Sequence, residues 1–330
     1  MNDVPLVIMR VFIVVAAIAA VLVSASTDRV GTMELVRTVN KKTKLWTASL
    51  SSPVAGLSHA EARTLLGAGP EGFEDPAKFM REQKYSAEEI LKAPESYDPR
   101  DYYPNCSSMR VIRDQSACGS CWAFGSVGSM SDRTCMAENA DIVLSANDIL
   151  ACSGGGGCEG GHPNLAFQYW MRQGIVTEDC QPYPFPSCDH HRNSSSSNPC
   201  PSEAYPTPEC SQKCKNGKDW NKDKHFCSVY YFIDGEENFC TDLSLRGPCE
   251  ADFAVYEDFM VYTSGIYHHV TGDIIGYHSV KILGYGVDNG TKYWLVANSW
   301  NEHWGENGFF RILRGVNECN IETRGIAGRA

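Results

Sequence analysis

The spacing of apolar residues predicts a helix in the first half of the chain. Ala123, Val127 and Met130 recur at intervals of four and three residues, as they would on one face of a helix. Cys121 would then stand in the first turn, where free N–H groups and the positive end of the helix dipole favour an anion. For a cysteine that anion is the thiolate, which is the nucleophilic form of the side chain.

The second half of the chain has the pattern of a β-sheet. Residues 277–287 alternate and are rich in β-branched side chains, and a turn at residues 288–290 separates them from a second strand at residues 292–298. Another strand is expected at residues 308–313. A helical half therefore precedes a sheet-rich half.

An apolar run at the N-terminus indicates the secretory route. Arg10 precedes the apolar residues 11–23, and the small residues Ser24 and Ala25 follow. These are the parts of a secretory signal peptide, predicted at residues 1–25; a membrane anchor is the alternative, although the run is short for a span. The secretory route explains the 15 cysteines. We expect a lysosome-like acidic compartment or secretion, with no stable membrane insertion after the signal is removed.

Composition argues against nucleic acid as a partner, and the sequence contains glycosylation motifs. The formal net charge is -11 and no basic patch stands out, so nucleic acid is not an expected partner. In a secreted chain the sequons at Asn105, Asn193 and Asn289 are predicted glycosylation sites.

Residues 26–92 contain no cysteine and are interpreted as a propeptide. Ser58 and Glu61 form the capping box of a short helix in this segment. Lys92 and the residues after it offer a processing site, so the mature domain is expected at residues 93–330. An ordinary N-terminal subdomain is the alternative.

The stretch Gln115–Trp122 carries the candidate chemistry. It holds Cys118 and Cys121 on either side of Gly-Ser, followed by an aromatic residue. This signature is typical of a cysteine-peptidase nucleophile. A C-x-x-C metal or redox pair is the alternative interpretation.

The motifs of residues 95–328 resemble those of the cathepsin B group of papain-like cysteine peptidases. The matching segments, in the same order, are residues 112–125, 158–161, 188–191, 268–273, 277–280, 298–300 and 304–315. The resemblance implies an α+β, papain-like two-lobe fold, with a helical left lobe, a β-barrel-like right lobe and a cleft between them. It also implies a zymogen whose propeptide inhibits the enzyme.

The resemblance assigns a catalytic set to this sequence. Cys121 would be the nucleophile, His278 the imidazole that takes its proton, and Asn298 the group that orients the imidazole. Gln115 would stabilise the oxyanion, and Trp300 would shield the His278–Asn298 hydrogen bond. His278 lies 157 residues after Cys121. That is longer than the roughly 130–150 residues usual in papain, which indicates an inserted segment.

The insertion is expected at residues 188–200, the position of the occluding loop. By resemblance, His190 and His191 receive the C-terminal carboxylate of a substrate, and Asp114 latches His190. These roles imply peptidyl-dipeptidase activity. Paired adjacent histidines are too weak a pattern to predict a metal site, and no cofactor is expected.

The second latch of this loop is missing from the sequence. The positions that would form it hold Ser196 or Ser197 and His303, which cannot make an ion pair of the usual kind. Arg192 could compensate in a different geometry. Because an exposed ion pair contributes only about 0–1 kcal/mol, we expect a loop that opens readily and endopeptidase activity beside dipeptide removal.

The resemblance also places the pocket for the second residue before the scissile bond. Gly160 and Gly161 would let the substrate backbone approach the cleft wall, since they carry no Cβ. A cation at position 324 would disfavour arginine in the pocket unless it is neutralised. The remaining pocket residues are expected to be His162, Pro163, Asp252, Ser279 and Arg324.

Five disulfides are implied by resemblance alone, and four other cysteines are left unpaired. The implied pairs are Cys106–Cys135, Cys118–Cys158, Cys152–Cys210, Cys180–Cys214 and Cys188–Cys200; the cysteines without an assigned partner are Cys227, Cys240, Cys249 and Cys319.

Peptide and protein substrates, the propeptide and cystatin-type inhibitors are the expected partners of a monomer. A catalytically silent peptide-binding protein on the same scaffold is one alternative, and the intact catalytic set argues against it. A cathepsin L-type endopeptidase is a second alternative, which the inserted loop disfavours.

Overall fold

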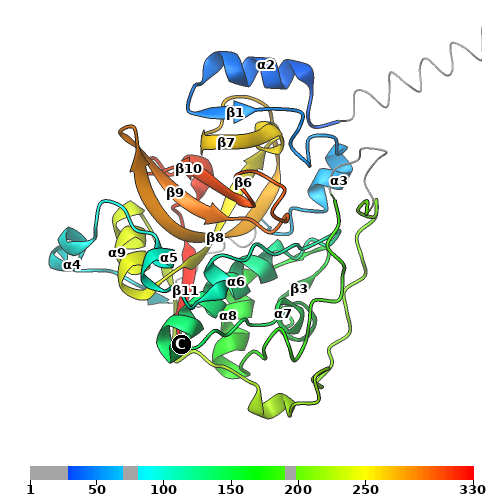
Figure 1. The fold of residues 1–330 in the computed structure, drawn as a ribbon, viewed down its shortest axis with the longest axis vertical. Coiled ribbons are helices and arrows are strands. Elements are labelled where there is room, and N and C mark those ends of the chain that lie inside the picture. The colour runs from blue at the N-terminus through cyan, green and yellow to red at the C-terminus, as the bar shows by residue number, and fades with distance from the viewer. Residues whose placement is uncertain (1–28, 70–80, 190–197) are drawn as a thin grey trace, which may run out of the picture.

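The computed structural model describes residues 29–69, 81–189 and 198–330 (Figure 1). The predicted signal peptide lies outside the described residues, as do His190, His191 and Asn193. Within the part of the chain that is described, no helix combines the length and apolar character needed to cross a membrane.

One part of the molecule is helical and is built around α6 (Cys121–Glu138). The predicted helix begins at Cys121 as expected, and Asn139 ends it in the left-handed conformation. The expectation of a single apolar stripe is incomplete, because α6 is buried on nearly every side between the other helices and the sheet. Its neighbours are α7 (Ala146–Cys152), α8 (Pro163–Arg172), β3 (Gly156–Gly157) and β4 (Gly160–Gly161).

The other part is a sheet in which the described residues form nine strands, in the order β1-β7-β10-β9-β8-β6-β11-β5-β2. Strand β8 pairs with β6 on one side and with β9 on the other, and it faces α6 across the boundary between the two parts (Figure 1). The strands of this half are β5 (Val229–Ile233), β6 (Cys249–Tyr256), β7 (Tyr262–Tyr267), β8 (Ile274–Asp288), β9 (Thr291–Ala297), β10 (Phe309–Leu313) and β11 (Gly325–Arg329).

The predicted hairpin is present, with one correction. Strands β8 and β9 are joined at Asn289 and Gly290, and both residues have positive φ as a tight hairpin turn requires. His278 was expected at the start of its strand, but it lies inside β8, because pairing with β6 already begins at Ile274.

The N-terminal segment (residues 29–69 and 81–92) packs on both parts of the molecule. Strand β1 extends the sheet by pairing with β7, and β2 extends the opposite edge by pairing with β5. The predicted capping box of Ser58 and Glu61 is confirmed. The elements of this segment are α2 (Met33–Lys42), β1 (Trp46–Ala48), α3 (His59–Arg63), β2 (Arg81–Glu82) and α4 (Ala87–Lys92).

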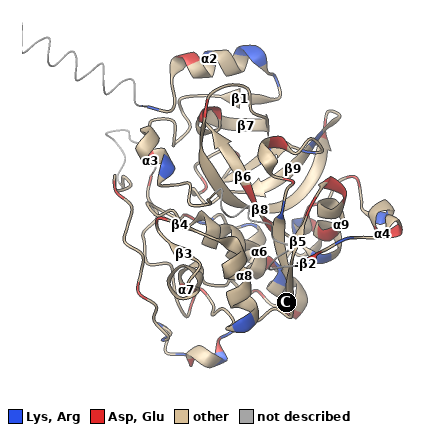
Figure 2. Ribbon diagram, turned by 180° about the vertical axis from the view of Figure 1, so that it is seen from behind, with Lys and Arg blue, Asp and Glu red and all other residues tan. Residues whose placement is uncertain are grey.

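Charge placement supports α2 as an exposed helix. Glu34 lies in its first turn, and Lys41 and Lys42 lie in its last, so both ends complement the helix dipole (Figure 2). The shorter helices elsewhere are α5 (Pro99–Tyr102), α9 (Glu236–Arg246) and the 3₁₀ turns Ser107–Met109, Trp220–Lys222, Glu257–Val261 and Glu318–Asn320.

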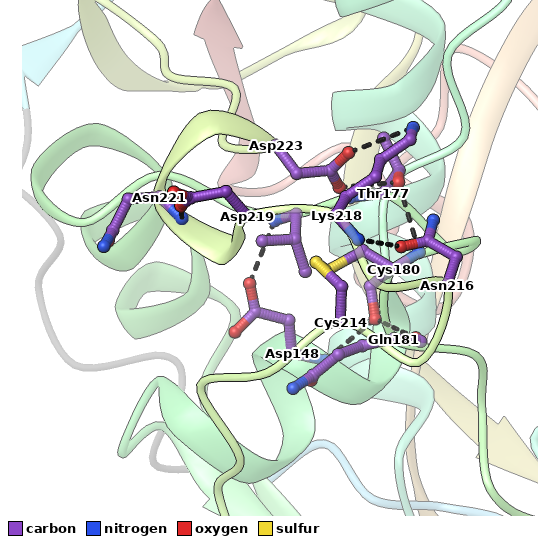
Figure 3. The surroundings of a disulfide bond; sticks show 12 residues. Asp148, Thr177, Cys180, Gln181, Cys214, Asn216, Lys218, Asp219, Asn221 and Asp223 are labelled. Atoms are coloured by element: carbon purple, nitrogen blue, oxygen red, sulfur yellow. Dashed lines mark hydrogen bonds and ion pairs between the residues drawn. A yellow bond between two sulfur atoms is a disulfide. The ribbon is translucent and has the colours of Figure 1, made fainter.

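All five implied disulfides are present, and Cys121, Cys227, Cys240, Cys249 and Cys319 are free thiols. Figure 3 shows the surroundings of Cys180–Cys214. Asp223 lies beside this disulfide, where its carboxylate accepts hydrogen bonds from Thr177 and pairs with Lys218. The two sulfurs are bonded to each other, so this group of side chains is a structural cross-link.

Candidate active site

Cys121 occupies the first position of α6, at the boundary between the helices and the sheet. Its side chain is fully buried, and it is a free thiol. The backbone N–H of Gly67 donates a hydrogen bond to Sγ at 3.1 Å, and the backbone of Ser279 on β8 also contacts the sulfur. The neighbour of Ser279 along the strand is His278, so the fold brings the expected nucleophile and base to the same place.

His278 is held by Asn298. Its Nε2 donates to Oδ1 of Asn298 at 2.7 Å, and the same oxygen accepts the backbone N–H of Ser299 at 2.8 Å. Because Nε2 is the donor, Nδ1 is the nitrogen left to accept a proton in the neutral ring. The ring of Trp300 packs 4.8 Å from the imidazole and is fully buried. Trp300 therefore covers the His278–Asn298 pair and is not an exposed surface of the cleft.

Gln115 is fixed in orientation by its neighbours. Its Oε1 accepts a hydrogen bond from Ser299 Oγ at 2.8 Å, which leaves the Nε2 end to donate elsewhere. Nε2 donates to the carbonyl of Cys118 at 2.8 Å and to the carbonyl of Leu65 at 3.1 Å. Ser299 is a positioning residue that the sequence interpretation missed, although it lies next to Asn298 in the chain.

The N-terminal segment runs through this site. The carbonyl of Leu65 lies on the Gln115 amide, the N–H of Gly67 lies on Cys121, and Ala68 makes β-bridges to Gly161 and Tyr277. The bridge to Gly161 is parallel, and Gly161 N donates to Gly67 O at 2.8 Å. The N-terminal segment presents the N–H of Gly67 to the sulfur, and a thiol cannot attack an N–H.

Burial under this segment keeps both reactive groups neutral. Burial raises the pKa of Cys121 to about 12, although hydrogen bonds from the backbone of Ser279 and Gly67 act to lower it. Burial lowers the pKa of His278 to about 4, although the bond to Asn298 and the contact with the Leu65 backbone act to raise it. In this state the thiolate expected at the helix start is not favoured, because desolvation of a charge outweighs the helix dipole.

Gly160 and Gly161 lie close to Trp122 and to the N-terminal segment. A Cβ on Gly161 would lie 2.4 Å from the ring of Trp122, and a Cβ on Gly160 would lie 2.9 Å from the carbonyl of Gly67. The ring of Trp122 is held in place by its N–H, which donates to Gly157 O. His162 is the N-cap residue of α8, without a capping bond from its side chain, and Pro163 is buried as the first residue of that helix.

Of the other predicted pocket residues, the structure brings Asp252 and Ser279 together. Asp252 lies directly across from Ser279 in the pairing of β6 with β8, and Arg324 is partly exposed with positive φ just before β11. Glu250 is 1% exposed and accepts a hydrogen bond from Ser279 Oγ at 2.6 Å. The sequence interpretation missed Glu250, although alternate residues of a strand share a face and Asp252 was already a candidate.

The base of the 188–200 loop is tied to Asp114. Its carboxylate accepts the backbone N–H groups of Ser116 and Cys188, and the side-chain amide of Asn301. A cavity of about 760 Å³ lies beside this base, and it is lined in part by Arg113, Glu178 and His303. The predicted contact of Asp114 with His190 falls outside the described residues.

Two of the three predicted glycosylation sites are described. Asn105 is exposed beside the Cys106–Cys135 disulfide, and Asn289 is exposed at the β8–β9 turn. Both positions are accessible to a glycan.

Comparison with known proteins places this geometry in context. The family model described as papain family cysteine protease matches residues 93–329. The chain is 44% identical over 313 residues to a cathepsin B-like cysteine proteinase 6 of Caenorhabditis elegans, covering 89% of this chain and 82% of the relative. It is 43% identical over 298 residues to a cathepsin B-like cysteine proteinase of Schistosoma japonicum, covering 86% of each.

Solved structures agree with the fold. The chain matches proCathepsin B S9 from Trypanosoma congolense with a TM-score of 0.79 and 36% identity, covering 91% of this chain and 98% of the other. A stem bromelain precursor matches with a TM-score of 0.69 and 22% identity, covering 89% and 86% of the two chains. The second similarity concerns the fold alone.

Proposed function

Since the chain belongs to the papain family of cysteine proteases and is cathepsin B-like, we propose that Cys121 and His278 hydrolyse peptide bonds by nucleophilic catalysis. Removal of the propeptide (residues 26–92) returns water to both side chains. The burial that keeps them neutral is then lost, and the proton of Sγ passes to Nδ1 of His278. The product is a thiolate beside an imidazolium, whose other nitrogen remains bonded to Asn298.

The thiolate attacks the scissile carbonyl carbon, and the carbonyl oxygen becomes an oxyanion. That oxyanion accepts hydrogen bonds from Gln115 Nε2 and from the backbone N–H of Cys121. The imidazolium gives its proton to the departing amine, which leaves a thioester on Cys121. A water molecule, deprotonated by the imidazole, then attacks the thioester and releases the acid product and the thiolate.

One observation carries this proposal. The carbonyl oxygen of Leu65 accepts a hydrogen bond from Gln115 Nε2 at 3.1 Å, and two residues later the N–H of Gly67 donates to the buried thiol. This contact supports the proposal that Gln115 Nε2 receives the oxyanion of a substrate. The amide cannot easily turn away, because Ser299 holds its oxygen. The propeptide survives there because its N–H, rather than its carbonyl carbon, faces the sulfur.

Labelling by the epoxide inhibitor E-64 tests the mechanism. We expect one equivalent to bind the processed enzyme covalently and Cys121→Ala to bind none. Cys319→Ala removes a different partly exposed free thiol and is the matched control, which should label normally. Intact, well-folded enzyme that neither labels nor cleaves peptides would favour a silent peptide-binding protein instead.

We further propose endopeptidase activity beside peptidyl-dipeptidase activity. In support, the second latch of the 188–200 loop is absent from the sequence, and an open cavity of about 760 Å³ lies beside the loop base. Comparing cleavage of one peptide as its C-terminal amide and as its free acid tests this. An absolute requirement for the free acid would contradict the proposal.

The pocket for the second residue before the scissile bond is proposed to disfavour arginine, because Arg324, which the resemblance assigns to this pocket, would repel a cation unless Asp252 neutralises it. A peptide with Phe-Arg before the scissile bond should be cleaved better than one with Arg-Arg. Glycosylation at Asn105, Asn193 and Asn289, a lysosome-like or secreted location, a monomeric state and inhibition by cystatin-type proteins remain parts of the same proposal.

A further inference from the structure

Residues 81–92 of the propeptide extend one edge of the sheet. Strand β2 pairs in parallel with β5, with Glu82 opposite Phe232, and the N–H of Gln83 donates to Phe232 O at 2.9 Å. In the described sheet β5 lies between β11 and β2, so removal of β2 leaves the outer edge of β5 unpaired. An unpaired edge of this kind can accept another extended chain through backbone hydrogen bonds.

Tyr85 fixes the same segment in a polar pocket on α9. It is 8% exposed, and its hydroxyl donates to Asp242 Oδ2 at 2.5 Å while it accepts from Arg246 Nε at 2.8 Å. The guanidinium of Arg246 also lies over the Tyr85 ring, 5.7 Å from its centroid. The backbone N–H of Tyr85 donates to Asn238 Oδ1 at 3.3 Å. The pocket therefore offers both an acceptor and a donor to one phenolic hydroxyl, which a phenylalanine could not use.

The acceptor in this pocket is held by the mature domain itself. Asp242 is fully buried, and its Oδ1 is paired with Arg133 of α6, which is 3% exposed. Arg133 also donates to Pro248 O and Gly328 O, so it is fixed from several sides. Because none of these contacts involves the propeptide, the carboxylate should stay in place when residues 81–92 leave. Its Oδ2 then loses the hydroxyl that it accepts in the zymogen, which is costly for a buried charged group.

This groove is separate from the active site. Helices α4 and α9 lie on the side of the molecule away from β3 and β4 in both views (Figure 1, Figure 2). The part of the propeptide that covers the active site is residues 65–68, whose backbone contacts Gln115 and Cys121. The two parts of the propeptide thus have different tasks, since residues 65–68 cover the thiol and residues 81–92 dock on β5 and α9.

We propose that the processed enzyme keeps a tyrosine-selective exosite, which binds the excised segment 81–92 without blocking Cys121. The exosite is the edge of β5 together with the pocket of Asn238, Asp242 and Arg246 on α9. Burial and the neighbouring carboxylate raise the pKa of Tyr85, so its hydroxyl stays protonated and remains the donor. The ligand is therefore an extended chain with a neutral phenol. This inference goes beyond the proposed peptidase function and does not depend on it.

Binding of a synthetic peptide tests the proposal. The probe has the sequence of residues 81–92 with a fluorescent label at its N-terminus. The enzyme is the processed form after reaction with E-64, so the peptide can be neither cleaved nor held at Cys121. We expect saturable binding by fluorescence anisotropy. Tyr85→Phe in the peptide should weaken it roughly 10- to 100-fold, because the hydroxyl bonds to two charged groups are lost. Lys84→Gln is the matched control and should change the affinity less than about threefold, because Lys84 is exposed and pairs with Glu82 of the same segment.

Variants of the enzyme separate the possible outcomes. Arg246→Gln should weaken the tyrosine peptide by roughly tenfold and reduce its advantage over the phenylalanine peptide. Arg172→Gln removes an exposed arginine on α8 and should leave the affinity unchanged. No saturable binding, equal affinity for the two peptides, or binding that disappears once E-64 occupies the active site overturns the inference. If E-64 does not label the enzyme, the proposed function fails, and the same titration of the unlabelled enzyme still decides the exosite.

Discussion

Two regions of the propeptide hold the zymogen closed by different kinds of contact. Strand β1 anchors it through an aromatic side chain: Trp46 is 3% exposed, lies 5.1 Å from the ring of Tyr267, and donates its indole N–H to His268 O. Residues 65–68, here called the plug, block the site with backbone groups, which contact Gln115 and Cys121, while the side chain of Leu65 is buried in the core. Burial of the apolar Trp46 side chain contributes binding free energy but touches no catalytic group. The backbone polar groups of residues 65–68 instead form hydrogen bonds with the catalytic groups.

The comparison suggests that two properties of the propeptide can be changed separately: how tightly it binds, and how well it covers Cys121. Strand β1 with Trp46, here called the anchor, pairs with β7, away from Cys121. A change in the anchor should therefore weaken binding of the whole propeptide while leaving the catalytic geometry intact. The plug touches Gln115 and Cys121 directly. A change there should uncover the thiol while the anchor holds.

The largest effect is expected from Trp46→Ala. Truncation of a buried tryptophan costs about 3–5 kcal/mol, because apolar contacts are lost and a cavity remains. We expect the rate at which iodoacetamide alkylates Cys121 in the unprocessed chain to rise by roughly 10²–10³-fold. The processed enzyme made from the same variant should have normal kcat/KM. Unchanged alkylation would show that β1 is not the anchor.

Acid should destabilise the folded zymogen through the buried His278. The folded zymogen keeps His278 neutral with a pKa of about 4, whereas an unfolded histidine titrates near 6.5. The unfolded state therefore binds more protons in this window, and the free energy of unfolding rises with pH from about 4 to 6.5. On acidification the zymogen should lose up to about 3 kcal/mol. Thermal unfolding of Cys121→Ser with and without His278→Gln measures this, and equal pH dependence in both would contradict it.

Gly67→Ala addresses the plug alone. A Cβ at this position would lie 1.8 Å from the carbonyl oxygen of Gly119, which is backbone and cannot turn aside. The expected cost is about 1–3 kcal/mol, so alkylation of Cys121 in the zymogen should rise by roughly ten- to hundredfold. Gly56→Ala is the matched control, because the space around a Cβ there is open. If both variants behave alike, the contact with Gly119 is not what positions the plug.

The smallest effect is expected at the His59–Glu257 contact. The two side chains are 2.8 Å apart but about 30% and 26% exposed. Such a pair contributes about 0.2–1 kcal/mol. His59→Ala should therefore change the alkylation rate by less than about fivefold, and a larger change would mean that polar contacts share the anchoring role.

The sequence by itself determined the elements and the reactive residue types. The spacing of Ala123, Val127 and Met130 predicted a helix at Cys121, and the turn at Asn289 and Gly290 predicted the hairpin that carries the base. These patterns are local, since they depend on side-chain period and backbone preference. Resemblance to the cathepsin B group supplied the five disulfide pairs, which spacing alone could not assign.

Only the tertiary structure decided which groups meet and in what charge state. Leu65 and Gly67 carry no chemical signature, and they reach Cys121 because the chain folds back through the cleft. The neutral state of Cys121 and His278 arises from burial by that distant segment, which no local pattern reports. In the same way Glu250 joins Asp252 and Ser279 through strand pairing. Desolvation and long-range contacts depend on the whole fold, and for that reason the sequence identified the residues but not their environment.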